Sequence, residues 1–194
     1  LPACPSNAGT GLRASVMLHL LGLRLAEDLD AVLRALDQLR LNVRGVGGEG
    51  SDAAGHMFQI SNQGTLGRTE EEVLQELLSH ANEIVRQERF ARLRLLRDNP
   101  RVIEDCVARA LALLQNARII PADEALDYLS GLLLGSELRM LRRADAARIE
   151  ELMLGVQPGF LQRRMGREAD AGQRDIFRAD WLREQLAEVT MRPW

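Results

Sequence analysis

The chain of 194 residues carries 25 basic and 28 acidic side chains, and 46% of its residues are apolar, a balance typical of a globular protein with one large domain or two small ones. A net charge of −3 and a pI near 5.7 argue against a generic nucleic-acid binder, and the longest apolar runs are far too short to span a membrane. All 25 basic residues are arginine, which excludes a Walker A loop, a protein-kinase-type lysine and Schiff-base chemistry, because each of these needs an amine.

The N-terminus begins abruptly at Leu1, without an initiator methionine or a signal-peptide pattern, so we expect a piece of a longer protein. Cys4 and Cys106 are too few for a disulfide framework, which favours a reduced, cytoplasmic setting. Cys106 lies in an apolar helical stripe, where we expect it to be part of the core. No spacing of histidine, cysteine and carboxylate residues suggests a metal site, and we expect none.

Turn residues crowd the segment Cys4–Arg13, whose sequence is CPSNAGTGLR, immediately before the first predicted strand. That strand is predicted over residues 13–20, because apolar side chains alternate there with polar ones. One face then belongs to the core, whereas the other presents Arg13 and Ser15 beside a glycine turn that lets a ligand approach the backbone. An ordinary glycine turn with a surface arginine explains the segment equally well.

The rest of the first half alternates between helix, strand and loop. Periodicity predicts a helix over 26–38, a strand over 39–44 and a short strand over 57–61. Arg44 ends the second strand on its polar face, and the glycine-rich loop 45–55 that follows carries Glu49. A mobile loop bearing one carboxylate suits a lid that delivers a catalytic group, although a flexible hairpin loop with a solvated glutamate is an equally good interpretation.

From residue 69 onward the sequence predicts almost continuous helix. Thr69 and Glu72 form a capping-box pattern at the start of a helix that runs to Asp98, where Asn99-Pro100 stops it. Further helices are predicted over 101–115, 122–133, 137–154 and 173–189, separated by Pro121, Gly135 and Pro158-Gly159. We therefore expect an α+β fold with one domain over 1–98 and an all-helical domain over 99–194.

The first half resembles the C-terminal catalytic domain of the ATP:guanido phosphotransferases, the family of creatine and arginine kinases. The run Cys4–Arg13 is similar to the signature of that family. Arg44, followed five residues later by Glu49, fits the family's second phosphate-binding arginine and its loop carboxylate, and Asn62 and Leu66-Gly67 also fit. The resemblance covers residues 1 to about 95 and implies an antiparallel sheet flanked by helices; it also implies that Cys4 is an active-site cysteine.

The second half is similar to the bacterial protein-arginine kinases of the same family. Arg174–Ala179, with the sequence RDIFRA, matches their Arg-Asp-x-x-Arg-Ala motif. The resemblance implies that 99–194 is a dimerisation and regulatory domain, and that Arg174, Asp175, Arg178 and Ala179 line an allosteric pocket for phosphoarginine. Arg174 and Arg178 share a helix face, so two guanidinium groups could clamp a phosphate while Asp175 accepts from a guanidinium. Taken alone, the motif is more simply an exposed, salt-bridged helix.

The reaction that this resemblance implies moves the γ-phosphoryl group of ATP onto the guanidinium of a protein arginine, with Mg²⁺ carried by the nucleotide. Arg13 and Arg44 would neutralise the transferring group, and Glu49 would orient the substrate guanidinium and accept its proton. The expected nucleotide contacts are these three residues with Ala14, Ser15, Val16, Met17, Gly45, Val46, Gly47 and Gly48. A second carboxylate and further arginines would lie upstream of Leu1, so we expect the chain alone to be a poor enzyme or none.

The expected partners are protein substrates with exposed arginines, phosphoarginine and a second copy of the chain, but neither nucleic acid nor membrane. Leu132, Leu133 and Leu134 in one helical turn favour the homodimer, because a thin helical layer would not bury them alone. The resemblance also implies contact with a Clp protease machinery and a heat-shock repressor. Two alternatives remain: a small-molecule phosphagen kinase, and a non-catalytic module that binds phosphoarginine.

Overall fold

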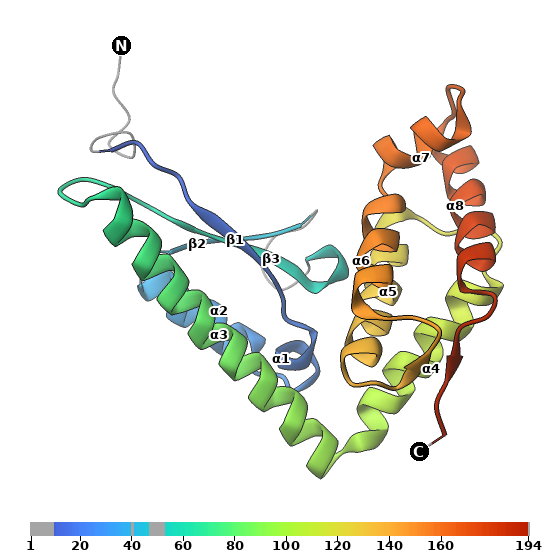
Figure 1. Ribbon diagram of the computed structural model, residues 1–194, viewed down its shortest axis with the longest axis horizontal. Helices are drawn as coiled ribbons and strands as arrows, with labels where there is room; N and C mark the ends of the chain where they lie inside the picture. Colours follow the sequence, from blue (N-terminus) through green and yellow to red (C-terminus); the bar gives the residue numbers. More distant parts are fainter. Residues whose placement is uncertain (1–9, 40, 47–52, 194) are drawn as a thin grey trace. The chain divides into compact units, whose positions relative to one another are not determined.

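The computed structural model describes residues 10–39, 41–46 and 53–193 (Figure 1). Its contacts divide the chain into two compact units, Leu1–Asp98 and Asn99–Trp194, called here the N-terminal unit and the C-terminal unit. Among the helices described, none offers the uninterrupted apolar length that a membrane crossing requires.

The N-terminal unit is built on a three-stranded antiparallel sheet. Its strands are β1 (Ser15–His19), β2 (Leu41–Gly45) and β3 (Met57–Asn62), in the order β1-β3-β2. The register places Val16 and Val43 on either side of Ile60, and because side chains alternate along a strand, all three share the face that packs in the core. The predicted strands are confirmed, with ends that differ by one or two residues.

The described part of this unit also contains three α-helices, α1 (Leu21–Leu25), α2 (Leu29–Gln38) and α3 (Glu70–Asp98), and a short 3₁₀ helix, η2 (Ala54–His56), directly before β3. One hydrophobic core is formed by the apolar face of the sheet, which includes Phe58, and by side chains of α2 and α3, which include several leucines and Ile84. The predicted helix over 26–38 is wrong at its start, because Glu27 adopts a left-handed φ of 61° that separates α1 from α2.

The start of α3 follows the predicted capping box. Glu72 N–H donates to Thr69 Oγ1 at 3.2 Å, and Thr69 N–H donates to the Glu72 carboxylate at 2.8 Å. These hydrogen bonds to Thr69 lower the pKa of Glu72. The helix then continues without a break to Asp98, as expected, and Pro100 opens the next helix.

The C-terminal unit is helical, as expected, apart from one short ladder. Its helices are α4 (Pro100–Asn116), α5 (Ala122–Glu137), α6 (Ala146–Gly155), α7 (Pro158–Met165) and α8 (Ala171–Leu186), and its strands are β4 (Leu141–Arg142) and β5 (Thr190–Met191). Leu132, Leu133 and Leu134 are all buried within this unit. The leucine run therefore gives no argument for a dimer, and that part of the expectation is wrong.

The predicted helix over 137–154 is wrong in its first half, whereas α6 confirms its second half. Arg139 and Arg143 adopt left-handed φ values of 58° and 62°, and β4 lies between them. Helix α6 begins only after Asp145, whose carboxylate accepts a hydrogen bond from Arg148 N–H at 2.9 Å. The sequence does not predict the left-handed backbone at Arg139 and Arg143, because arginine has no preference for that region.

Gly135 and Pro158 act differently from expectation. Gly135 lies inside α5, where an added Cβ would come within 2.6 Å of Val107 on α4, so this glycine permits close helix packing rather than ending a helix. Pro158 starts α7, a helix that the sequence analysis missed. Cys106, expected in the core, is only partly buried, and this burial raises the pKa of its thiol.

Candidate functional site

The face of the sheet opposite the core is polar. It carries Ser15 and Met17 of β1, Asn42 and Arg44 of β2, and Gln59 and Ser61 of β3, which we call the polar face. Met17 and Arg44 lie on either side of Gln59, and Gln59 Nε2 donates to Ser15 Oγ at 2.9 Å. These six residues include no carboxylate, so the polar face suits an anion.

The structure divides the predicted nucleotide contacts of β1 between the two faces. Ser15 and Met17 are exposed on the polar face, as the alternation predicts. Ala14 and Val16 pack against the core instead, so a ligand on the polar face would meet only their backbone. Gln59 was missed by the sequence analysis, although the alternation within 57–61 could have placed it beside Ser15 and Arg44.

Arg13 lies two residues before β1 and is exposed. The backbone on both sides of it is held from the end of β3 by the side chain of Asn62, and Gly11 is held by Thr65. By the alternation of the strand, Arg13 belongs to the same side as Ser15 and Met17. Arg13 and Arg44 are therefore two exposed guanidinium groups on one side of the sheet.

Arg44 is followed by the predicted catalytic loop. Val46 N–H donates to Met57 O at 3.0 Å, and Ala54 N–H donates to Val46 O at 2.7 Å, so the two ends of this loop meet at the Arg44 end of β2. Gly45 and Val46 are described and partly buried. The remaining predicted residues of the loop, Gly47, Gly48 and Glu49, lie outside the described residues, as does Cys4.

His19 ends β1 on the side of Met17 but takes no part in an acid–base site at neutral pH. Burial, the charge of Arg92 and, to a smaller extent, His56 lower the pKa of His19 to about 3. Its imidazole is therefore neutral.

A buried carboxylate anchors the segment that follows β1, and the sequence analysis missed it. Glu88 of α3 accepts hydrogen bonds from Gly22 N–H at 2.7 Å and Leu23 N–H at 2.8 Å, and from Arg92 Nε at 2.6 Å. Glu88 is only 4% exposed. These bonds satisfy backbone donors at the start of α1 and tie the sheet to α3.

The Arg-Asp-x-x-Arg-Ala motif lies on α8, where its two arginines have different surroundings. Arg178 is only 1% exposed; it donates from Nε to Val156 O at 2.9 Å and from Nη1 to Ile120 O at 2.7 Å and Asp175 Oδ1 at 2.6 Å. Asp175 keeps 24% of its side chain exposed. Arg174, which is partly exposed, donates to Ala169 O at 2.6 Å. Ala179 is buried.

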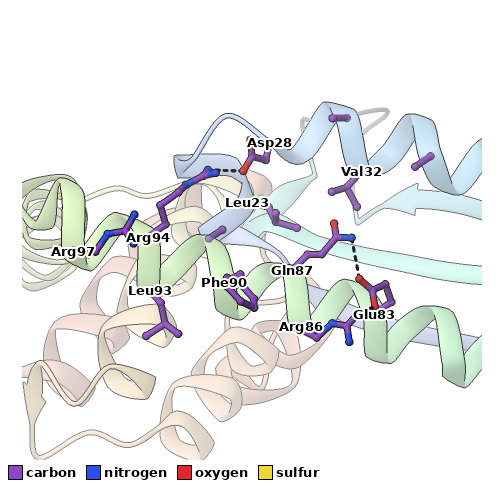
Figure 2. Close-up of a pocket in the computed structure, with 13 residues that line it drawn as sticks. Leu23, Asp28, Val32, Glu83, Arg86, Gln87, Phe90, Leu93, Arg94 and Arg97 are labelled. Carbon is purple, nitrogen blue, oxygen red and sulfur yellow. Dashed lines mark hydrogen bonds and ion pairs between the residues drawn. The ribbon is translucent and has the colours of Figure 1, made fainter.

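A groove with a volume of about 990 Å³ lies between α2 and α3 of the N-terminal unit. Figure 2 shows the side chains that line it. Its apolar wall includes Phe90 and Leu93, which are exposed. Its charged side chains are already in ion pairs: Arg94 with Asp28, Arg86 with Glu83, and Arg97 with Asp98. Figure 2 also shows the hydrogen bond that Gln87 donates to Glu83. Of the residues predicted for the nucleotide site or the phosphoarginine pocket, none that the structure describes lines this groove.

Comparisons with known proteins match both units. The family model described as "ATP:guanido phosphotransferase, C-terminal catalytic domain" matches residues 1–91, and the one described as "Protein-arginine kinase McsB C-terminal domain" matches residues 100–193. The chain is 47% identical over 189 residues to the protein-arginine kinase of Pelotomaculum thermopropionicum, covering 97% of this chain and 53% of that protein.

Two further curated relatives carry the same name. The protein-arginine kinase of Moorella thermoacetica is 46% identical over 187 residues, which are 96% of this chain and 53% of the relative. That of Bacillus pumilus is 44% identical over 186 residues, which are 96% of this chain and 51% of the relative. The chain thus spans about half the length of the curated relatives it matches. Its residues 1–91 match the catalytic domain of the ATP:guanido phosphotransferase family and, along nearly its whole length, the chain resembles the protein-arginine kinases.

Proposed function

We propose that the natural protein is a protein-arginine kinase, which transfers the γ-phosphoryl group of ATP to arginine side chains of proteins. The observation that carries the proposal is the pair of exposed arginines, Arg13 and Arg44, on one side of the sheet. Both lie in the segment that matches the guanido phosphotransferase catalytic domain. The similarity of residues 100–193 to a protein-arginine kinase domain favours a protein substrate over a small guanidino metabolite.

Phosphate binding on the polar face would depend on guanidinium groups, because the chain has no lysine. Arg13 and Arg44 each offer a planar fork of donors that fits phosphate oxygens. The neutral side chains around them, Ser15, Asn42 and Gln59, leave the positive charge available to a nucleotide. Mg²⁺ bound to the ATP phosphates would add neutralising charge during transfer.

We assign to Glu49 the role of binding the substrate guanidinium. A guanidinium is a poor nucleophile, because it is cationic and its pKa is so high that it keeps its proton at neutral pH. A carboxylate that aligns it and accepts a proton late in the transfer addresses both problems. The assignment rests on the resemblance and on the position of Glu49 between Val46 and Ala54, whose hydrogen bond closes the loop beside Arg44.

For the C-terminal unit we propose a phosphoarginine pocket formed by Arg174 and Asp175. Arg174 would bind the phosphate, and the exposed part of the Asp175 carboxylate would accept from the ligand's guanidinium. Arg178 would support the pocket from within, because its guanidinium is buried and already donates to two backbone carbonyls and to Asp175. In this proposal, Arg178 is not the second phosphate clamp that the helical spacing suggests.

The wider setting follows from the same resemblance. We propose residues 1–98 as part of the phosphotransferase domain and 99–194 as a dimerisation and regulatory domain of a cytoplasmic homodimer. Apolar side chains that stay exposed in the C-terminal unit, such as Ile119, Leu154 and Phe160, favour a partner surface there. A Clp protease machinery and a heat-shock repressor remain expected partners by resemblance.

The test uses the natural protein, with any sequence that precedes Leu1. It is incubated with Mg·ATP and either casein, an unstructured protein, or free arginine, and the rates of phosphorylation are compared. We expect phosphoarginine on casein and little on free arginine. A preference for free arginine would indicate the phosphagen-kinase alternative. Binding of phosphoarginine without any ATP turnover would indicate the non-catalytic module.

The phosphoarginine pocket has its own test. Free phosphoarginine is titrated into the natural protein by calorimetry, with Arg174→Ala and the exposed control Arg167→Ala. Only Arg174→Ala should abolish binding. Equal affinity in all three proteins would remove Arg174 from the pocket.

A further inference from the structure

One side chain at the end of β3 holds the backbone on both sides of Arg13. Asn62 Oδ1 accepts from Ala14 N–H at 2.8 Å, and Asn62 Nδ2 donates to Leu12 O at 3.0 Å. The backbone N–H of Asn62 also donates to Ala14 O, at 3.4 Å. Arg13 therefore lies between two residues that are tied to the same neighbour, just before the ladder of β1 begins at Ser15.

Only a carboxamide can make both side-chain bonds. Its oxygen accepts and its nitrogen donates within one planar group, as a peptide group of a neighbouring strand would do. Aspartate has two acceptor oxygens and would face the Leu12 carbonyl with a like partial charge. The amide orientation is set by this network, because the reverse orientation would oppose two donors and two acceptors.

A second bond continues the attachment toward the glycine turn. Gly11, with a left-handed φ of 69°, donates its N–H to Thr65 Oγ1 at 3.3 Å, and Thr65 is only 2% exposed. The segment 11–14 is thus attached to the segment 62–65 beyond the last pair of the sheet. The backbone around Arg13 is therefore held by the hydrogen bonds to Asn62 and Thr65, not by the hydrogen-bond ladder of the sheet.

The same strand also sets the position of Arg44. In the register of β2 and β3, Leu41 lies opposite Asn62 and Arg44 lies opposite Gln59. We propose that Asn62 is a positioning residue that fixes Arg13 at a set distance along the sheet from Arg44, which is level with Met17, so that both guanidinium groups meet the phosphates of one nucleotide. This inference rests on the proposed function only in naming the nucleotide as the ligand.

The test is a double-mutant cycle on nucleotide affinity. Calorimetry measures the Kd of Mg·ADP for the natural protein, with any sequence before Leu1, and for Asn62→Ala, Arg13→Ala and the double variant. Asn62→Ala should weaken binding by about 10-fold, the scale of misplacing one charged contact. In the Arg13→Ala background the same change should alter Kd by less than about twofold, because coupled residues are not additive.

Two variants separate positioning from folding. Gln63→Ala, at the exposed neighbouring residue, should bind like the wild type with the same melting temperature. Asn62→Asp conserves the size of the side chain and one acceptor oxygen, and it should bind Mg·ADP as weakly as Asn62→Ala does. If the Asn62→Ala protein does not fold, Asn62→Asp takes its place in the double-mutant cycle. The proposal is overturned if Asn62→Asp binds like the wild type, or if either Asn62 change weakens binding equally with and without Arg13. A wild type that binds Mg·ADP but phosphorylates no arginine would overturn the proposed function alone.

Discussion

Arginine on the polar face differs from lysine in geometry as well as in charge. A guanidinium can bind two phosphate oxygens at once, whereas an ammonium is a compact point charge. We therefore expect Arg13→Lys and Arg44→Lys in the natural protein to lower kcat/KM for ATP by at least about 10-fold. Steady-state kinetics on casein measure this, with melting temperature as the control for folding. Lysine variants with nearly wild-type kcat/KM would mean that charge alone suffices.

The buried pair of Arg178 and Asp175 should matter to stability far more than surface pairs do. Asp175→Ala would leave the 1%-exposed guanidinium of Arg178 without its carboxylate, a change that destabilises proteins by about 3–5 kcal/mol. Glu188→Ala breaks an exposed pair with Arg143 and should change stability by at most about 1 kcal/mol. Urea unfolding of both variants measures the difference. Equal effects would contradict the structural role of Arg178.

His19 should make stability depend on pH. Its folded pKa, about 3, lies below the ordinary value of 6.5, because burial and the nearby Arg92 and His56 oppose the charged form. The unfolded chain binds the extra proton, so the contribution is full above pH 6.5 and is lost as the pH falls toward 3. From pH 7 to pH 5 the free energy of unfolding should fall by about 2 kcal/mol from this group. Urea denaturation should show a smaller loss of unfolding free energy between pH 7 and pH 5 in His19→Gln than in the wild type. The same pH dependence in both proteins would contradict this role of His19.

The attachment of α1 to α3 depends on a glycine, Gly22, because a side chain at this position would collide with α3. A Cβ on Gly22 would lie 2.6 Å from both Glu88 Oε1 and Arg92 Cγ. Gly22→Ala should therefore disturb the buried Glu88 pair and destabilise the protein by about 1–3 kcal/mol, the usual range for overpacking. Gly64→Ala is the matched control, because a Cβ there meets no atom within 4 Å. Similar unfolding midpoints for the two variants would contradict this account of the anchor.

Elements with a local signal could be predicted from the sequence, and those set by distant contacts could not. Strands β1, β2 and β3 follow from alternation, and α3 follows from its Thr69 capping box, whereas β4 and β5 were not predicted. The breaks at Glu27, Arg139 and Arg143 could not be predicted, because residues that seldom adopt left-handed φ are placed there by tertiary packing. Gly135 was misjudged for a related reason: its role appears only when α4 packs against α5.

The candidate site divides in the same way. Arg13 and Arg44 could be placed on the polar face by alternation alone, and the structure agrees in exposing both. The hydrogen bonds of Asn62 to Leu12 and Ala14 join residues about 50 positions apart, so no local pattern announces them. The burial of Arg178 likewise depends on carbonyls of distant segments, although its helical spacing from Arg174 suggested a shared exposed face.

The two units of the chain have separate proposed roles. The N-terminal unit carries the two arginines on a sheet whose middle strand sets their spacing, and it matches the catalytic domain of the guanido phosphotransferases. The C-terminal unit buries Leu132, Leu133 and Leu134 and matches the C-terminal domain of the protein-arginine kinases. The main proposal is that the natural protein phosphorylates arginine in proteins, and that Glu49 aligns the acceptor guanidinium and accepts its proton.

Mass spectrometry of casein after incubation with Mg·ATP tests this claim most directly, if the natural protein and its Glu49→Gln variant are compared. We predict phosphate on arginine residues with the wild type, and a rate at least about 10²-fold lower with Glu49→Gln, the scale of losing a positioned acid–base group. Nucleotide affinity should stay unchanged in the variant. Phosphate on serine or threonine, no phosphate at all, or equal phosphoarginine with both proteins would contradict the account.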